Sequence, residues 1–234
     1  MLKLGKIRLG DSPKIAATVG DLSPKTVKKI KECRAHILEL RLDEVRKIDA
    51  HSISRILKIV KSAKLPVICT IRSLKEGGKQ FIPAEMRLQL FKMVIPEVDG
   101  VDVELGSTSI LNSVIKFAHK FHKLVIVSYH NFNLTPTKNK LEGIIKEARR
   151  RKADIVKIST LARSVGDILT LGSVTHENRK RNIITLAMGK TGAISRVFLP
   201  LIGSLVTYGF VDRPHAPGQL SVKTLKQDFK KYIA

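Results

Sequence analysis

Eight short β-rich runs, each followed by a segment with helical periodicity, constrain the fold of this chain more than any other feature of its sequence. Most of the runs are continuously apolar, as parallel strands are when both faces of the sheet are covered. Strand followed by helix, repeated eight times, predicts a single (β/α)8 barrel, a TIM barrel of eight parallel strands with surrounding helices, over residues 1–234. An open doubly wound sheet is the alternative, and the count of eight favours the barrel. The predicted strands are Ile15–Val19, Ile37–Leu42, Val67–Ile71, Val101–Leu105, Leu124–Ser128, Ile155–Ile158, Ile183–Ala187 and Val206–Phe210.

Two of the predicted helices have clear starts. Ser23 and Pro24 are typical of an N-cap and a first helical residue. Another helix begins at Pro83-Ala84-Glu85, and its Met86, Leu90 and Met93 or Val94 recur at helical spacing, so we expect them to form its apolar face.

Composition indicates an ordinary globular protein. Hydrophobic residues make up 43% of the 234, and no apolar run approaches the ~20 residues of a membrane helix. The first ten residues are basic and lack the apolar centre of a signal peptide, so we expect a soluble, cytoplasmic protein. The two cysteines, Cys33 and Cys69, cannot build a disulfide framework, and no Cys/His spacing predicts a metal site.

The chain carries 43 Lys and Arg against 20 acidic residues, a formal net charge of +23. Such an excess serves a polyanionic partner, solubility or the steering of an anionic substrate, and composition alone does not choose. Nucleic-acid binding as the main function is disfavoured, because aromatic residues are only 5% and no binding motif occurs. The densest basic runs are Lys28, Lys29, Lys31 and Arg34, then Arg149 to Lys152, then Arg179 to Arg181.

Each of these basic runs lies at a helix end or just before the next strand. In a (β/α)8 barrel those positions are at the bottom, opposite the active site. Cations at helix C-termini are also favoured by the helix dipole. We therefore expect a basic bottom face that binds polyanions weakly, without sequence preference and apart from catalysis.

The active site of such a barrel lies at the C-terminal ends of its strands. Charged side chains inside apolar strands are costly unless they are paired, so several of them at one end of the barrel predict a charged pocket. The polar residues at those ends include Glu39, Arg41, Arg72, Asp102, Glu104, His130, Lys157 and Arg196.

Lys157 is the sharpest candidate. It lies between Val156 and Ile158 in the sixth strand, where burial and nearby cations would favour the neutral amine that attacks a ketone to form an imine. The alternative is a structural lysine paired with a barrel carboxylate such as Glu104. His130 ends the neighbouring strand and can act as general base and acid, although a lone histidine there is more often structural.

Three further side chains are candidates for binding a substrate. Arg72 and Arg196 each offer a forked donor to a carboxylate or hydroxyl. The alternative for Arg72 is an ion pair with Glu39, Glu76 or Glu104, and for Arg196 a position on the surface of a helix. Gln219 follows Pro-Gly, a turn sequence, so it either packs in the loop or acts as a ligand on a mobile lid.

Several motifs, in order along nearly the whole chain, resemble those of type I 3-dehydroquinate dehydratases. Each is weak alone, and together they are specific. They are Glu39-Leu-Arg41-Leu-Asp43, Thr70-Ile-Arg72-Ser, Glu76-Gly-Gly, Ser128-Tyr-His130-Asn-Phe132, Val156-Lys157-Ile158, Met188-Gly-Lys190-Thr-Gly-Ala-Ile-Ser195-Arg196 and Ala216-Pro-Gly-Gln219.

The resemblance implies a lyase that converts 3-dehydroquinate to 3-dehydroshikimate in the shikimate pathway to aromatic amino acids. Lys157 would form a Schiff base with the C3 ketone, His130 would move the protons, and Glu76 would orient His130. The substrate carboxylate would be bound by Arg196 and Gln219, and its hydroxyls by Glu39, Arg41 and Arg72, with Thr18 as a further hydroxyl ligand. A protonated imine is itself the electron sink, so we expect no metal or organic cofactor. Relatives imply a homodimer.

One alternative enzyme and one departure from the family remain. A class I aldolase would share the sixth-strand lysine, but it would not need the Glu-Gly-Gly and Ala-Pro-Gly-Gln segments.

In the family, the position before Ala-Pro-Gly-Gln is often a serine that contacts substrate, and here it is His215. We expect the loop from Val211 to Leu220 to be a mobile lid. His215 either contacts substrate when this lid closes or faces solvent, and its bulk relative to serine favours solvent.

Overall fold

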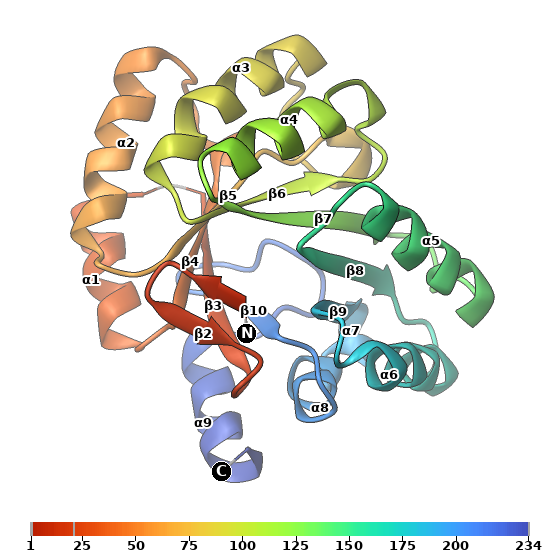
Figure 1. Cartoon of the computed structure of the whole chain (residues 1–234). Coiled ribbons are helices and arrows are strands. Elements are labelled where there is room, and N and C mark those ends of the chain that lie inside the picture. The colour runs from red at the N-terminus through yellow and green to blue at the C-terminus, as the bar shows by residue number, and fades with distance from the viewer. Residues whose placement is uncertain (1, 21, 234) are drawn as a thin grey trace.

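The computed structural model describes residues 2–20 and 22–233, and it contains eight parallel strands in a nearly closed barrel inside a ring of helices (Figure 1). The predicted barrel is therefore confirmed, with strand order β10-β3-β4-β5-β6-β7-β8-β9. At the remaining junction, between β9 and β10, Leu205 N donates to Ile183 O at 2.9 Å. The barrel strands are β3 (Lys14–Val19), β4 (Ile37–Arg41), β5 (Val67–Thr70), β6 (Gly100–Glu104), β7 (Leu124–Asn131), β8 (Ile155–Leu161), β9 (Ile183–Met188) and β10 (Val206–Phe210).

The helices follow the strands as expected. The helix α1 begins with Ser23 as its N-cap, whose side chain accepts from Thr26 N at 3.1 Å. Two short 3-10 turns, η1 (Leu42–Glu44) and η2 (Leu74–Glu76), follow β4 and β5 and carry acidic side chains toward the barrel axis. The helices are α1 (Pro24–Glu32), α2 (Ala50–Ser62), α3 (Ala84–Val94), α4 (Thr108–Lys120), α5 (Lys138–Arg150), α6 (Val165–Asn178), α7 (Gly189–Gly192), α8 (Ser195–Leu201) and α9 (Val222–Tyr232), with a third turn, η3 (Ile95–Glu97).

A two-stranded hairpin that the sequence did not predict precedes the barrel, formed by β1 (Leu2–Leu4) and β2 (Ile7–Leu9) and drawn in red in Figure 1. Its Leu4 and Leu9 are buried in the cluster that fills the barrel at the amino ends of the strands, together with residues such as Ile37 and Ile155. Strands of three residues between basic side chains have too little periodicity to be recognised, so only burial against the barrel reveals them.

The helix α3 is rotated relative to its predicted apolar face. Met86 and Met93 are 44% and 45% exposed, whereas Arg87 is only 4% exposed and lies on the buried side with Leu90 and Phe91. The expectation for the two methionines was therefore wrong. The reason is tertiary, because a carboxylate and a carbonyl group inside the barrel bind Arg87.

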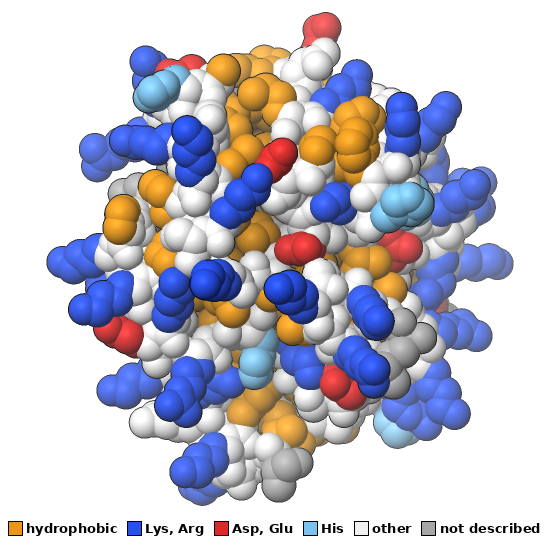
Figure 2. Space-filling model, turned by 60° about the vertical axis from the view of Figure 1, so that its left-hand side comes forward, with side chains coloured by type: hydrophobic (Ala, Val, Ile, Leu, Met, Phe, Trp, Pro, Cys, Tyr) orange, Lys and Arg blue, Asp and Glu red, His pale blue; other side chains and the backbone are white. Residues whose placement is uncertain are grey.

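Basic side chains end several helices. Lys29 and Lys31 lie in the last turn of α1, and Arg149 and Arg150 lie in the last turn of α5. The excess charge is not confined to such ends, because Figure 2 shows Lys and Arg side chains spread over the whole visible face with few acidic ones between them. Within the described residues, no helix is long and apolar enough to cross a membrane.

Candidate active site

One pocket opens at the carboxyl ends of the barrel strands, and all nine side chains named from the sequence line it. They come from seven strands or the loops that follow them, so the barrel topology alone brings them together. The nine are Thr18, Glu39, Arg41, Arg72, Glu76, His130, Lys157, Arg196 and Gln219. Other lining residues, which the sequence did not single out for the site, include Phe132, Ser159, Leu186, Met188 and Tyr208.

Lys157 lies at the floor of this pocket with its side chain only 6% exposed. Its Nζ is 2.9 Å from Asp102 Oδ2 and 3.6 Å from Glu39 Oε1, and it stands 4.0 Å from the centre of the Tyr208 ring. The lysine therefore pairs with a barrel carboxylate, but the partner is Asp102 and not Glu104. Asp102 thus accepts a hydrogen bond from the amine, and Glu39 lies just beyond hydrogen-bond distance.

Arg72 connects the two carboxylates of β6. Its guanidinium is 2.9 Å from Asp102 Oδ1 and 3.2 Å from Glu104 Oε1, and it donates to Ser128 Oγ at 2.8 Å. Burial raises the pKa of Asp102, but Arg72 and Lys157 more than offset this and hold it well below its usual range. Burial likewise lowers the pKa of Arg72, and Asp102 and Glu104 outweigh that effect and raise it. The ion pair anticipated as an alternative for Arg72 is thus present.

His130 and Glu76 form a second pair at the pocket wall. Nδ1 and the backbone N of His130 both lie 2.9 Å from Glu76 Oε2. Burial, reinforced by Arg72 and Lys157, lowers the pKa of His130 well below 6.5. Burial also raises the pKa of Glu76 to about 7, although Arg72 opposes the shift. In the neutral imidazole whose Nδ1–H donates to Glu76, Nε2 keeps a free lone pair.

Arg196 is a buried cation at the pocket's edge. It is 2% exposed, so the alternative of a surface arginine is wrong. The start of α8 is fixed beneath β9, because Ser195 Oγ accepts from Ala187 N at 2.9 Å. Arg196 donates to two backbone carbonyls, and among the described residues no carboxylate pairs with it. Burial alone lowers its pKa to about 10, so at neutral pH it is a charged donor without an anion.

The loop after β10 covers part of the pocket. Gln219 Nε2 donates to Thr18 Oγ1 at 3.3 Å, and Thr18 Oγ1 in turn donates to Glu39 Oε2 at 2.9 Å. His215 lines the pocket and its side chain is only 7% exposed, because Nδ1 lies 2.9 Å from Glu44 Oε1. The expectation that His215 faces solvent was therefore wrong.

Known proteins share both the sequence and this architecture. The family model of type I 3-dehydroquinase matches residues 16–231. The 3-dehydroquinate dehydratase of Methanococcoides burtonii is 34% identical over 229 residues, which are 97% of each chain. That of Hydrogenobaculum is 36% identical over 196 residues, covering 84% of this chain and 88% of the relative.

Two solved structures agree. The type I enzyme of Clostridium difficile, determined with covalently modified comenic acid, superposes with a TM-score of 0.92 at 30% identity and covers 98% of this chain and 96% of its own. The enzyme of Geobacillus kaustophilus superposes with a TM-score of 0.90 at 28% identity, and the match covers 100% of this chain and 97% of that enzyme.

The chain belongs to the type I 3-dehydroquinase family. It is thus an enzyme of the 3-dehydroquinate dehydratase type, and a class I aldolase is not the right interpretation of its sixth-strand lysine.

Arg87 is a residue of this dehydroquinase that the sequence did not indicate. From α3 it donates to Glu104 Oε2 and to Ile71 O, each at 2.6 Å. Glu104 in turn contacts Arg72, so Arg87 closes the outer end of the charged network that reaches Lys157. A basic residue next to apolar positions on a helix was the only indication in the sequence, and it is a weak one.

We expect Arg87→Met to lower the free energy of unfolding by about 3 kcal/mol, because Glu104 would stay buried and lose a charged partner. Urea unfolding followed by circular dichroism measures this. The control is Lys92→Met on the exposed side of the same helix, which should change stability by no more than about 0.5 kcal/mol. Equal effects of the two substitutions would contradict the role given to Arg87.

Proposed function

We propose that this chain dehydrates 3-dehydroquinate to 3-dehydroshikimate through an imine on Lys157, as a step of the shikimate pathway. The observation that carries the proposal is the arrangement of one pocket. A buried amine, an imidazole whose pKa is lowered by burial, and a buried arginine that pairs with no carboxylate among the described residues all line it, in a chain of the type I dehydroquinase family.

The first step is attack of Lys157 Nζ on the C3 ketone. The ammonium of Lys157 first gives one proton to Asp102 Oδ2, at 2.9 Å from Nζ. The C3–N bond then forms, and the nitrogen gives a second proton to the ketone oxygen. Asp102 returns the first proton to this oxygen, the C3–O bond breaks, and water leaves behind a protonated imine. Glu39 is the second acceptor within reach.

The second step is the elimination. His130 Nε2 removes a proton from C2, and the electron pair of that C–H bond moves toward the positive imine to form an enamine. The electrons return, the C1–O bond breaks, and the proton on His130 leaves with the hydroxyl as water. Glu76 stabilises the imidazolium between these events. Hydrolysis of the imine then releases product and restores Lys157.

Substrate binding uses the remaining polar side chains. Arg196 and Gln219 bind the carboxylate, since Arg196 is charged and pairs with no carboxylate among the described residues. Glu39, Arg41 and Thr18 bind ring hydroxyls. Arg72 is held by Asp102, Glu104 and Ser128, which favours an electrostatic role near the imine over a direct grip on a hydroxyl.

Borohydride trapping with 3-dehydroquinate tests the proposal. We expect one adduct per chain on Lys157, identified by peptide mass mapping, and no adduct or turnover in Lys157→Ala. His130→Ala is the matched variant: it should keep the adduct and lose about 10²–10⁴-fold in turnover, because only the proton transfers are impaired. An adduct on Lys190 or Lys75, or near-normal turnover of His130→Ala, would refute these assignments.

We propose that the protein forms a homodimer. The helix α6 contains no Lys or Arg, although the chain holds 43 of them, and it exposes Val165 and Leu169. The helix α8, which contacts α6, exposes Leu201. Two strongly cationic chains repel each other least when this surface of one chain contacts the same surface of the other.

We propose that the protein works in the cytoplasm. Its free thiols, Cys33 and Cys69, fit a reducing compartment, and cell fractionation should recover the protein in the cytoplasmic fraction.

Sedimentation equilibrium should give the mass of two chains for the wild type. Leu169→Lys places a charge in the proposed interface and should give a monomer. Phe81→Lys changes a side chain that is also exposed, outside this surface, and should leave the dimer intact. A monomeric wild type, or a dimer that survives Leu169→Lys, would contradict the proposed interface.

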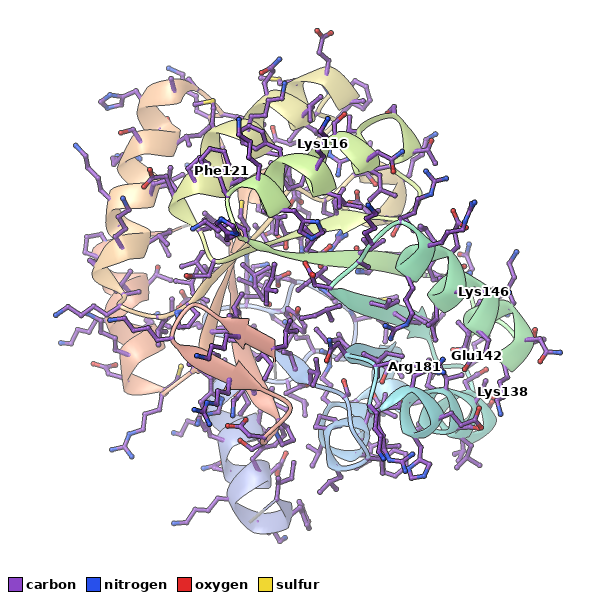
Figure 3. All side chains as sticks on the ribbon, viewed as in Figure 1. Lys116, Phe121, Lys138, Glu142, Lys146 and Arg181 are labelled. Carbon is purple, nitrogen blue, oxygen red and sulfur yellow. The ribbon has the colours of Figure 1, made fainter. Side chains whose placement is uncertain are left out.

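We also propose weak polyanion binding at the bottom of the barrel. A groove between α4 and α5 is lined by Lys116, His119, Arg150 and Arg151. Lys116, Lys146 and Arg181 lie on this side of the molecule and come from α4, α5 and the segment after α6 (Figure 3). A phosphate backbone would bind through charge alone, so its affinity would fall steeply with salt.

Replacing Lys116, Arg150 and Arg151 with glutamine should weaken RNA binding and reduce the salt slope by about 2, at roughly 0.7 per lost contact with a single strand. Filter binding over a salt series measures this. The matched control replaces the exposed Lys223, Lys230 and Lys231 of α9 with glutamine. If both triple variants bind RNA equally well, or if the groove variant loses much of its turnover, the groove is not a separate polyanion site.

A further inference from the structure

Three loops meet at the mouth of the pocket, around the carboxylate of Glu44. Gly20 follows β3, Glu44 ends η1, and His215 belongs to the loop after β10. A Cβ on Gly20 would lie 2.6 Å from Glu44 Cβ and 2.6 Å from its Oε2, so only a glycine lets the first loop pass this closely. The Glu44 side chain is consequently 2% exposed.

Two cationic or donor groups share this buried carboxylate. His215 Nδ1 lies 2.9 Å from Oε1 and 3.0 Å from Oε2, and Arg41 Nη1 lies 3.4 Å from Oε1. An ionised carboxylate only accepts, so Nδ1 of His215 carries the proton in these contacts. Burial raises the pKa of Glu44, but the hydrogen bond from His215 and the charge of Arg41 outweigh this and lower it. One carboxylate thereby connects the loop after β10 to Arg41 in the pocket.

The same loop is attached at a second point, to the end of β9. Gly189 N donates to Pro217 O at 3.1 Å, and Arg196 Nε donates to Gly218 O at 3.0 Å. Gly218 has a φ of +70°, and a Cβ there would overlap the carbonyl oxygen of Gly189. The backbone is therefore held on one side by β9 and on the other side by Glu44.

These two attachments set the direction of Gln219. The backbone N of His215 donates to Gln219 Oε1 at 2.6 Å, which leaves the Nε2 amide group to point toward Thr18 and the pocket. If His215 moves, the acceptor of this hydrogen bond is freed and the amide can turn. The side chain that would bind the substrate carboxylate thus depends on where His215 is held.

We propose that Glu44 and His215 are a positioning pair, which holds the loop after β10 over the bound substrate and orients Gln219 and Arg41 toward it. This inference rests on the proposed function. In the family, the position of His215 is often a serine that contacts substrate directly. In this chain the histidine binds Glu44 across the mouth of the pocket, and its contribution to substrate binding passes through Gln219.

The pair can be tested with Glu44→Gln and His215→Asn, singly and together. We expect each single variant to raise KM about tenfold, as expected for loss of a buried charge-assisted hydrogen bond, with kcat changed by less than about threefold. Imine trapping on Lys157 should remain complete at saturating substrate. The double variant should be no worse than either single one, because both remove the same interaction. The exchanged pair, Glu44→His with His215→Glu, should recover part of the lost affinity.

Arg213→Gln is the matched control. Arg213 lies in the same loop, with Nη2 4.0 Å from Glu44 Oε2, but its side chain is 74% exposed, so we expect wild-type kinetics. Thermal melting of all variants separates loss of folding from loss of positioning. A wild-type KM for Glu44→Gln would overturn the inference. So would a result in which every variant, Arg213→Gln included, shows the same fall in kcat, rise in KM and fall in imine trapping.

A readout without substrate keeps this inference distinct from the proposed reaction. Hydrogen exchange of residues 213–219 should be faster in Glu44→Gln than in the wild type or Arg213→Gln. If the wild type fails to turn over 3-dehydroquinate, the proposed function is wrong. Unchanged exchange in Glu44→Gln would refute the attachment of the loop by Glu44, whatever the reaction.

Discussion

Burial of charge at one end of a closed barrel is the constraint on which the rest of this structure depends. An isolated ion in such a place costs several kcal/mol, and good geometry with an opposite charge is needed to offset it. Arg72 and Lys157 share Asp102, and Arg72 and Arg87 share Glu104, so removing any member of this network takes an opposite charge away from a buried partner. These contacts hold the amine of Lys157 between Asp102 and Glu39 at the floor of the pocket.

The two ends of the barrel interior differ in polarity. At the amino ends of the strands, an apolar cluster that includes Ile37, Ile126 and the hairpin residue Leu4 fills the interior. At the carboxyl ends, the interior is polar and the loops close over it. Because the strands are parallel, each strand delivers its last residues to the same place, and residues more than a hundred positions apart in the sequence meet there.

The distribution of acidic residues makes the surface more cationic than the interior. Many carboxylates bind cations or the imidazole of His130 around the pocket and are therefore not available on the outside. This group comprises Glu39, Asp43, Glu44, Glu76, Asp102 and Glu104. The remaining surface is correspondingly dominated by lysine and arginine (Figure 2). Such a surface attracts anions from a distance.

The sequence by itself determined the barrel and the set of residues around its pocket. Eight apolar runs separated by helical segments allow few topologies, and in a barrel the residue after a strand has only one end to occupy, so Lys157, His130 and Arg196 had to be close. Only the tertiary structure decided which partners they have. The choice of Asp102 for Lys157, the burial of Arg87 and the turn of His215 toward Glu44 depend on distances of a few ångströms between side chains on different elements. Local periodicity indicates which face of a helix or strand is apolar. It does not indicate which side chain from a distant segment contacts that face, so these contacts could not be predicted from the sequence.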